Sequence, residues 1–179
     1  MKSFSVGQGI QQRGIGDIIE DTVFVVTKGL IPELQYATSK RTMEDFQVEV
    51  EGHTYKFDVK THDSDASFSM PNLVSVKRLK KYLADPTNHL VYVFITYEIR
   101  NDMCMITNVR LHEVDELHWD CLHIQNLGKG QLQLRNSNNI QLMEQNREVW
   151  LHTLTDKTVE FYNSLIVSLQ KEIEGLINA

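Results

Sequence analysis

The sequence predicts a mixed α/β fold in which a mixed sheet is flanked by helices and a long helix closes the chain. Three observations support this class. Residues 44–60 and 89–111 each show two apolar or alternating runs around turn residues, which is typical of β-hairpins. Amphipathic helical patterns at 16–28 and 73–83 precede these hairpins. Residues 147–177 then carry apolar side chains at helical spacing.

Size and composition indicate one ordinary globular domain over residues 1–179. With 41% hydrophobic and 23% charged residues, the chain can bury a sizeable core. Cys104 and Cys121 form neither a metal-binding spacing nor a disulfide framework. No signal peptide or apolar run of about 18 residues is evident, so we expect a cytoplasmic protein without membrane contact. The net charge of −6 argues only mildly against nucleic acid, because a metal site also gathers carboxylates.

The helix predicted at 16–28 follows a glycine-rich lead-in that lacks the Lys-Ser/Thr ending of a phosphate-binding loop. Its apolar stripe consists of Ile15, Ile19, Val23 and Val26, and Gly29 and Pro32 end it. Glu20 lies at the flank of this stripe, about 100° from Ile19. It can therefore reach from the core edge into a cleft, although the spacing alone favours a surface glutamate.

The hairpin predicted at 44–60 contains the chemistry that stands out most. Asp58 and Lys60 share one face of its second strand, which we expect to be solvated, and Asp45 lies on the opposing strand. Two carboxylates beside a lysine can hold a hard divalent cation and place a cationic donor next to a bound substrate. Asp-x-Lys is also common on solvated strands, so this spacing alone leaves both interpretations open.

The segments that follow alternate between loops and regular elements. Residues 61–72 form a long polar loop, and Asn72 is expected to cap the basic helix at 73–83. Residues 89–98 read as a strand buried on both faces, residues 103–111 as its hairpin partner, and residues 113–123 as a short helix and turn.

Residues 126–136 alternate cleanly, which places Gln131, Gln133 and Arg135 on one face of a strand. Such side chains suit contacts with base edges or phosphates, but an ordinary exposed edge strand looks the same. The helix at 147–177, which threonines near 153–158 can interrupt, would span about 45 Å. It is long enough to reach a partner subunit.

The order of an upstream helical Glu, an Asp and an Asp-x-Lys resembles the PD-(D/E)XK nuclease core, with Glu44 in place of the proline. The chain resembles more narrowly the type II restriction endonucleases of the EcoRV, HincII and SwaI kind, from about Gly14 to the C-terminus. The segments that carry this resemblance are 57–61, 70–73, 90–97, 131–133 and 146–150.

The resemblance implies a restriction-endonuclease-like core and a role for each matching residue. Asp45, Asp58 and the Val59 carbonyl would bind Mg²⁺, Lys60 would position or activate the attacking water, and Glu20 would be an auxiliary acid. The residues that it places against DNA are Ser69, Met70 and Asn72 in a recognition loop, and Lys129, Gln131, Gln133 and Arg135 around the later strand.

The function implied is Mg²⁺-dependent cleavage of double-stranded DNA within a short palindrome, by a homodimer whose two-fold symmetry matches that of the site. A cognate DNA methyltransferase is expected as a separate protein. Three alternatives stay open at this point: a structure-selective nuclease of the Holliday-junction or repair type, a non-catalytic DNA-binding protein with a nuclease-like core, and an α/β domain whose acidic cluster is merely solvated.

Overall fold

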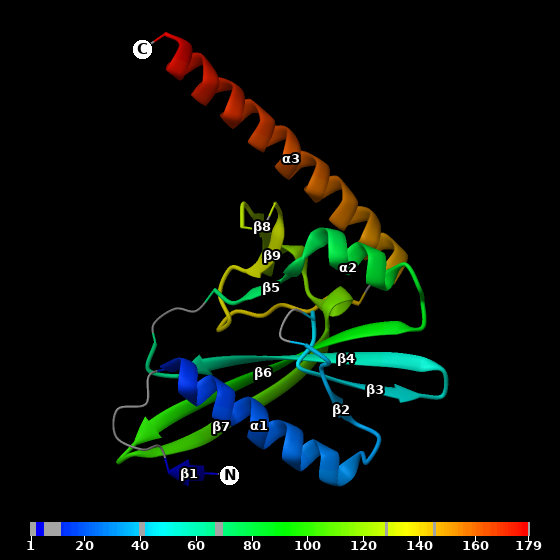
Figure 1. Cartoon of the computed structure of the whole chain (residues 1–179), viewed down its shortest axis with the longest axis vertical. Coiled ribbons are helices and arrows are strands. Elements are labelled where there is room, and N and C mark those ends of the chain that lie inside the picture. The colour runs from blue at the N-terminus through cyan, green and yellow to red at the C-terminus, as the bar shows by residue number, and fades with distance from the viewer. Residues whose placement is uncertain are drawn as a thin grey trace.

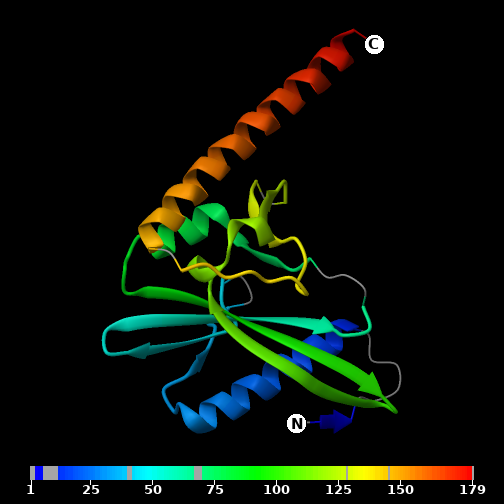
Figure 2. The same cartoon turned by 180° about the vertical axis from the view of Figure 1, so that it is seen from behind.

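The computed structural model describes residues 3–5, 12–39, 42–66, 70–127, 129–144 and 146–178. A six-stranded sheet forms the body, a three-stranded sheet and α2 lie against it, and α3 projects away from both (Figures 1 and 2). The elements are β1 (Ser3–Ser5), α1 (Gln12–Leu30), β2 (Gln35–Tyr36), β3 (Phe46–Val50), β4 (His53–Asp63), β5 (Asn72–Ser75), α2 (Val76–Leu83), β6 (Asn88–Arg100), β7 (Met103–Glu113), β8 (Leu122–Gln125), β9 (Gln131–Leu134) and α3 (Arg147–Ile177).

The larger sheet has the order β1-β7-β6-β4-β3-β2, and it is mixed because β4 and β6 run parallel while the other pairs are antiparallel. Both predicted hairpins are confirmed. Glu51 and Gly52 turn β3 into β4 with positive φ angles of 50° and 81°. Asn101 and Asp102 turn β6 into β7 in the same left-handed region.

Strand β6 is buried on both faces, as its sequence predicts, because a different layer covers each face. Val93 and Ile95 pack with Ile15 and Ile19 of α1. Tyr92 and Phe94, whose side chains alternate with these, belong to the main core on the other side. That core also contains buried residues of α2, the smaller sheet and α3, namely Leu79, Leu83, Leu122, Leu132, Leu134, Trp150 and Leu154.

The smaller sheet has the order β5-β9-β8, which contradicts one prediction and excludes one alternative left open by the sequence. Asn72 does not cap α2. It opens β5, because Asn72 pairs with Gln133 and Ser75 pairs with Gln131, which draws the segment into a strand before the helix begins at Val76. Strand β9 is the central strand of this sheet and not an exposed edge.

Residues 113–123 form two 3₁₀ turns, Val114–Glu116 and Trp119–Cys121, where the sequence predicts a short helix. Each turn packs against the main core through buried side chains, namely Val114, Leu117 and Trp119. Strand β8 then begins at Leu122.

Helix α3 runs from Arg147 to Ile177 as one helix, so the long helix is confirmed and its threonines near 153–158 do not interrupt it. The hydroxyls of Thr153, Thr155 and Thr158 each donate to the carbonyl four residues earlier, at 3.0, 2.8 and 2.6 Å. Threonines that make this bond remain compatible with a continuous helix. From residue 166 to residue 178 every residue is exposed, because the helix has left the body.

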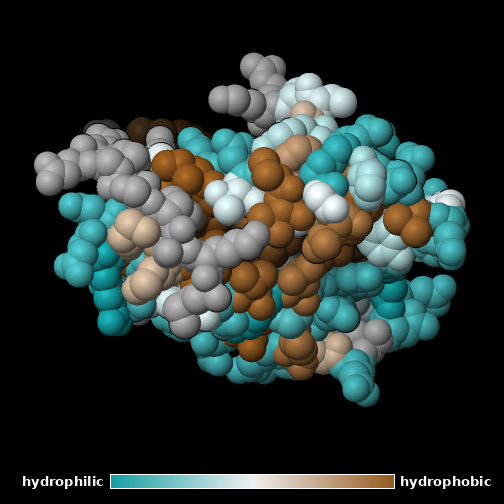
Figure 3. Space-filling model, turned by 90° about the horizontal axis from the view of Figure 1, so that it is seen from below, coloured by the Kyte–Doolittle hydropathy of each residue, from teal (hydrophilic) through white to brown (hydrophobic). Residues whose placement is uncertain are grey.

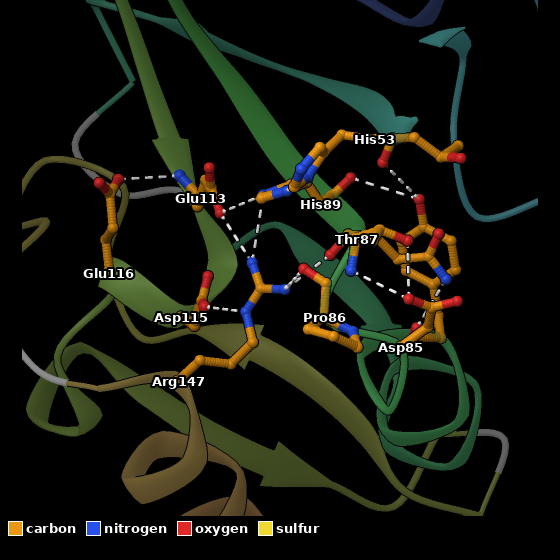
Figure 4. Close-up of polar contacts among 12 residues, drawn as sticks. His53, Asp85, Pro86, Thr87, His89, Glu113, Asp115, Glu116 and Arg147 are labelled. Atoms are coloured by element: carbon orange, nitrogen blue, oxygen red, sulfur yellow. Dashed lines mark hydrogen bonds and ion pairs between the residues drawn. The ribbon is translucent and has the colours of Figure 1, made fainter. Parts of the chain in front are cut away.

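A polar cluster around Arg147 fixes the direction in which α3 leaves (Figure 4). The guanidinium binds Glu113 at 3.0 Å and Asp115 at 2.6 Å, and it donates to the Asn88 carbonyl at 2.8 Å. His89 contacts the same Glu113 carboxylate at 3.0 Å. The first turn of α3 is thereby tied to β6 and to the end of β7.

An apolar surface covers α1 and β7 on the lower side of the molecule (Figure 3). Val26 and Val109 are exposed there, and they line a groove of about 450 Å³ between the two elements. Among the described residues, no helix is long and apolar enough to cross a membrane.

Candidate active site

A cleft of about 740 Å³ lies where α1, the start of the β3–β4 hairpin and the smaller sheet meet. Its lining includes Glu20 from α1, Asp45 from the residue before β3, and Asp58 and Lys60 from β4. All four predicted catalytic side chains therefore face one cavity, although they come from three segments of the chain.

Backbone pairing at the end of the hairpin places Asp45 against β4. The Asp45 amide donates to the Phe57 carbonyl at 2.8 Å, and the Val59 amide donates to Asp45 Oδ2 at 2.7 Å. On β4 itself, Lys60 Nζ donates to Asp58 Oδ1 at 2.5 Å. The two carboxylates and the ammonium group thus form one connected cluster.

Asp58 is buried, with 5% of its surface exposed, which corrects the expectation that its face of β4 is solvated. The reason is that the layer of α2 and the smaller sheet lies over this face of β4: Asp58 pairs in register with Tyr92, whose side chain is in the main core, and residues of β5 line the same cleft. Burial raises the pKa of Asp58 to about 7, although the adjacent Lys60 lowers it, and Asp45 raises it further. A carboxylate held in this way gains strongly from any additional positive charge nearby.

Glu20 is half-buried at the side of the cleft. Burial is the largest cause that raises the pKa of Glu20 to about 7, followed by the negative charges of Asp45, Asp17 and Asp21, while Lys60 lowers it. The dependence on Asp45 and Lys60 shows that Glu20 lies within the field of the hairpin cluster. The helix therefore does place this glutamate at the cleft and not on the open surface.

The donor chemistry of the cluster fits a hard divalent cation. Asp45 and Asp58 offer carboxylate oxygens that repel one another in a partly buried site, and a cation would relieve that repulsion. Within the described ranges no three His, Cys, Asp or Glu side chains come together as a metal-binding group. Two carboxylates completed by a backbone carbonyl and water suit Mg²⁺, which usually keeps several waters.

The residues predicted to contact DNA fall into different environments. Gln131 lines the cleft. Gln133 is buried, and its amide donates to the Met70 carbonyl at 3.0 Å and to Asn72 Oδ1 at 2.8 Å. Gln125 donates to the same Asn72 oxygen. These amides therefore brace the start of β5 on the smaller sheet.

The remaining members of that set lie around the same sheet. Arg135 donates to the Leu122 carbonyl at 3.0 Å, which links β9 to the start of β8. Lys129 is exposed in a left-handed turn, and its carbonyl accepts a bond from Tyr162 of α3 at 2.6 Å. Ser69 lies outside the described residues. DNA contact by any of these residues stays a prediction.

Sequence reasoning missed several residues of the cleft. Glu44 is buried and forms an ion pair with Lys56 at 2.9 Å, so it supports the hairpin from inside. Ser75 and Arg78 also line the cleft, and Arg78 brings a positive charge from α2. The basic pattern of α2 was visible in the sequence, but only the packing of α2 beside the hairpin shows which cation reaches the site.

No protein-family model matches the chain, and neither does any curated protein sequence. Among solved structures, the chain is similar to one titled "NlaIV restriction endonuclease", with a TM-score of 0.56 and 14% sequence identity. The match covers 90% of this chain and 83% of that one. At this identity the likeness concerns the fold, and it confirms the predicted class: the chain has a restriction-endonuclease-like fold, a mixed α/β core that carries a long C-terminal helix.

Proposed function

We propose that this protein is a Mg²⁺-dependent, site-specific endonuclease of double-stranded DNA, of the type II restriction class. The observation that carries the proposal is the cleft, in which Asp45, Asp58 and Lys60 converge from one hairpin and Glu20 joins them from α1. The likeness in fold to a restriction endonuclease supports the same conclusion.

Asp45, Asp58 and the Val59 carbonyl would hold Mg²⁺, which would polarise a water molecule and offset charge on the scissile phosphate. The protein supplies the rest of the chemistry. Asp45 is oriented by the Val59 amide, and Asp58 is oriented by Lys60. Lys60 keeps its ammonium group at the cleft, where it can donate to the attacking water or to the phosphate. Glu20 has a pKa raised to about 7, so near neutral pH it can hold or release a proton beside the cluster.

Sequence recognition falls to the smaller sheet and the loop before it. Gln131 reaches the cleft, and the bonds among Gln133, Asn72 and Met70 hold that edge of the sheet in one conformation. Amide side chains of this kind can pair with base edges in a groove. A palindromic target calls for a homodimer, and a cognate methyltransferase would protect the DNA of the host.

The direct test is incubation of the purified protein with long duplex DNA of known sequence, in Mg²⁺ or in EDTA, followed by sizing and end-sequencing of the products. Discrete Mg²⁺-dependent fragments that share one palindrome at their ends support the proposal and reveal the site. A smear favours a structure-selective or non-specific nuclease. DNA that stays intact across many templates and metals overturns the nuclease assignment and favours a DNA-binding protein.

Lys60→Ala tests the site within this assay. We expect the cleavage rate to fall by about 10²- to 10⁴-fold, since that is the usual contribution of a positioned proton donor. The exposed Lys171→Ala is the matched control and should cleave as the parent does. A Lys60→Ala protein that cuts at the parental rate would remove Lys60 from the mechanism.

A further inference from the structure

The distal half of α3 projects away from the body (Figures 1 and 2). Large apolar side chains on it are exposed in the part of the chain that the structure describes. Ile166 and Ile173 are 52% and 55% exposed, and Leu176 and Ile177 are 78% and 77% exposed. A single helix that projects into water is marginal in stability, and most helical stability in proteins comes from packing an apolar face. This half of the helix presents such a face without a partner.

Most of these exposed residues recur at one regular spacing, and we call this set the distal stripe; Val167 and Ile177 are exposed beside it. The distal stripe consists of Val159, Tyr162, Ile166, Leu169, Ile173 and Leu176. These positions alternate by three and four residues, which is the a and d pattern of a coiled-coil heptad. Glu160, Ser164, Lys171 and Glu174 lie on the opposite side of the helix.

We infer that the distal stripe binds a second copy of this chain as a parallel, two-stranded coiled coil. Val159, Ile166 and Ile173 occupy the a positions, and Tyr162, Leu169 and Leu176 occupy the d positions. A β-branched residue at a with leucine at d favours parallel dimers over larger assemblies, and the two heptads that follow Tyr162 have this pattern. The inference rests on the homodimer of the proposed function and assigns its interface.

The area of the distal stripe is sufficient for such a dimer. From the exposed fractions, the stripe and Ile177 together present on the order of 700 Å² per copy. Two copies would bury roughly 1,400 Å², which lies within the range of about 1,200–2,000 Å² for stable interfaces.

The e and g positions beside the distal stripe also permit two copies of the chain to pair. Asn163, Gln170 and Ile177 lie at e, and Leu165 and Glu172 lie at g. In a parallel pair, each g residue faces the e residue that follows on the partner helix, so Glu172 faces an isoleucine and no like charges meet. The flanks therefore carry no electrostatic barrier to self-association.

The attachment of α3 leaves room for the partner helix. The residues that face the body, including Trp150, Leu154 and Phe161, lie about 100° around the helix from the centre of the distal stripe. Within the stripe, Tyr162 also contacts the body, because its hydroxyl donates to the Lys129 carbonyl at 2.6 Å. From Ile166 onward every residue of the helix is exposed, so a second helix can reach this part of the stripe from beside the body. The Arg147 cluster and the buried Trp150 fix the direction in which α3 leaves the body. Because the two helices would be identical and parallel, the two-fold axis would run along the coiled coil.

The test is the molar mass of the full chain without DNA or metal, measured by light scattering and by sedimentation equilibrium. We expect the parent to show twice its 20.7 kDa chain mass and the double variant Ile166→Asp/Ile173→Asp to raise the dimer dissociation constant by at least about 100-fold. Ser164→Glu/Ser168→Glu adds the same charge on the far side of the helix and should remain dimeric. Thermal unfolding monitored by circular dichroism checks that the body of each variant still folds.

A parent that is monomeric at tens of micromolar, or a folded Ile166→Asp/Ile173→Asp protein that stays dimeric, overturns the inference. Orientation is tested with Leu176→Cys, since the native Cys104 and Cys121 are buried. A parallel pair places Leu176→Cys beside its twin, so mild oxidation should link the dimer. Linking only between Val159→Cys and Leu176→Cys chains would show an antiparallel pair instead. Failure to cleave DNA by a dimer that passes these tests counts against the proposed nuclease and leaves the interface intact.

Discussion

Replacing Asp58 by Asn should stabilise the protein when no metal is bound. Burial raises the pKa of Asp58 from 3.8 to about 7. Between these values the unfolded chain releases the proton and the native chain keeps it, so native stability falls as pH rises through this interval. The loss is about 1.4 kcal/mol per pH unit, or about 4 kcal/mol in total, and it is fully present above pH 7.

In Asp58→Asn, the amide oxygen would still accept the hydrogen bond from Lys60. The amide is neutral, so the native state no longer buries a negative charge. At pH 8 in EDTA we expect the free energy of unfolding to rise by about 2–4 kcal/mol. The rise is smaller than the full cost of burying the charge, because Lys60 loses its ion pair with Asp58. For a chain of this size such a gain raises the melting temperature by about 5–10 °C. At pH 5.5 the gain should be smaller by about 2 kcal/mol.

Calorimetry or circular dichroism melts at the two pH values measure this difference. Asp120→Asn is the matched control, since its carboxylate is 76% exposed and its change should stay within about 0.5 kcal/mol. A gain that is absent, or that does not grow with pH, refutes the argument that native Asp58 carries a buried charge. Added Mg²⁺ should raise the melting temperature of the parent and not that of Asp58→Asn, and equal rises would place the metal elsewhere.

Two further substitutions test the framework around the site. Arg147→Ala should lower the free energy of unfolding by about 2–3 kcal/mol, because it leaves the carboxylates of Glu113 and Asp115 without their cation. Arg100→Ala is the control: it removes the exposed partner of Glu98 and should lower the free energy of unfolding by less than about 1 kcal/mol. Equal losses in denaturant titrations would show that the Arg147 cluster does not anchor α3. Gly130→Ala should cost about 1–3 kcal/mol, because φ is +106° and the added methyl would lie 3.2 Å from Val76. Gly29→Ala meets nothing within 4 Å inside α1, so its melting temperature should not fall, and a fall as large as that of Gly130→Ala would contradict this account of backbone strain.

Periodicity alone was enough to place most of the regular elements. The alternating pattern of 44–60, the continuous apolar run of 89–98 and the helical spacing of 16–28 and 147–177 all correspond to observed strands and helices. These signals are local, since each depends on side chains a few residues apart along one strand or helix. The Asp-x-Lys pair and Asp45 were also visible, because the two strands that hold them are joined by a short turn.

Contacts between distant segments decided the rest. Asn72 looks like a helix cap, but pairing with Gln133 sixty-one positions later draws it into a strand. The sequence indicates a solvated face of β4 at Asp58, because it does not show that the smaller sheet and α2 pack over that face. Burial is a property of the packed layers, and it is burial that raises the pKa of Asp58.

The sequence by itself therefore indicated which residues have the chemistry proposed for the site, and it placed the helix of Glu20 and the hairpin of Asp58 and Lys60 to within a few residues, whereas it did not predict β5, which Asn72 opens. The tertiary structure decided that Glu20 faces the same cleft as the hairpin, that Gln133 braces a sheet, and that the distal half of α3 stands clear of the body. Local patterns are set by neighbouring side chains, whereas proximity, burial and exposure depend on which surfaces the whole chain brings together.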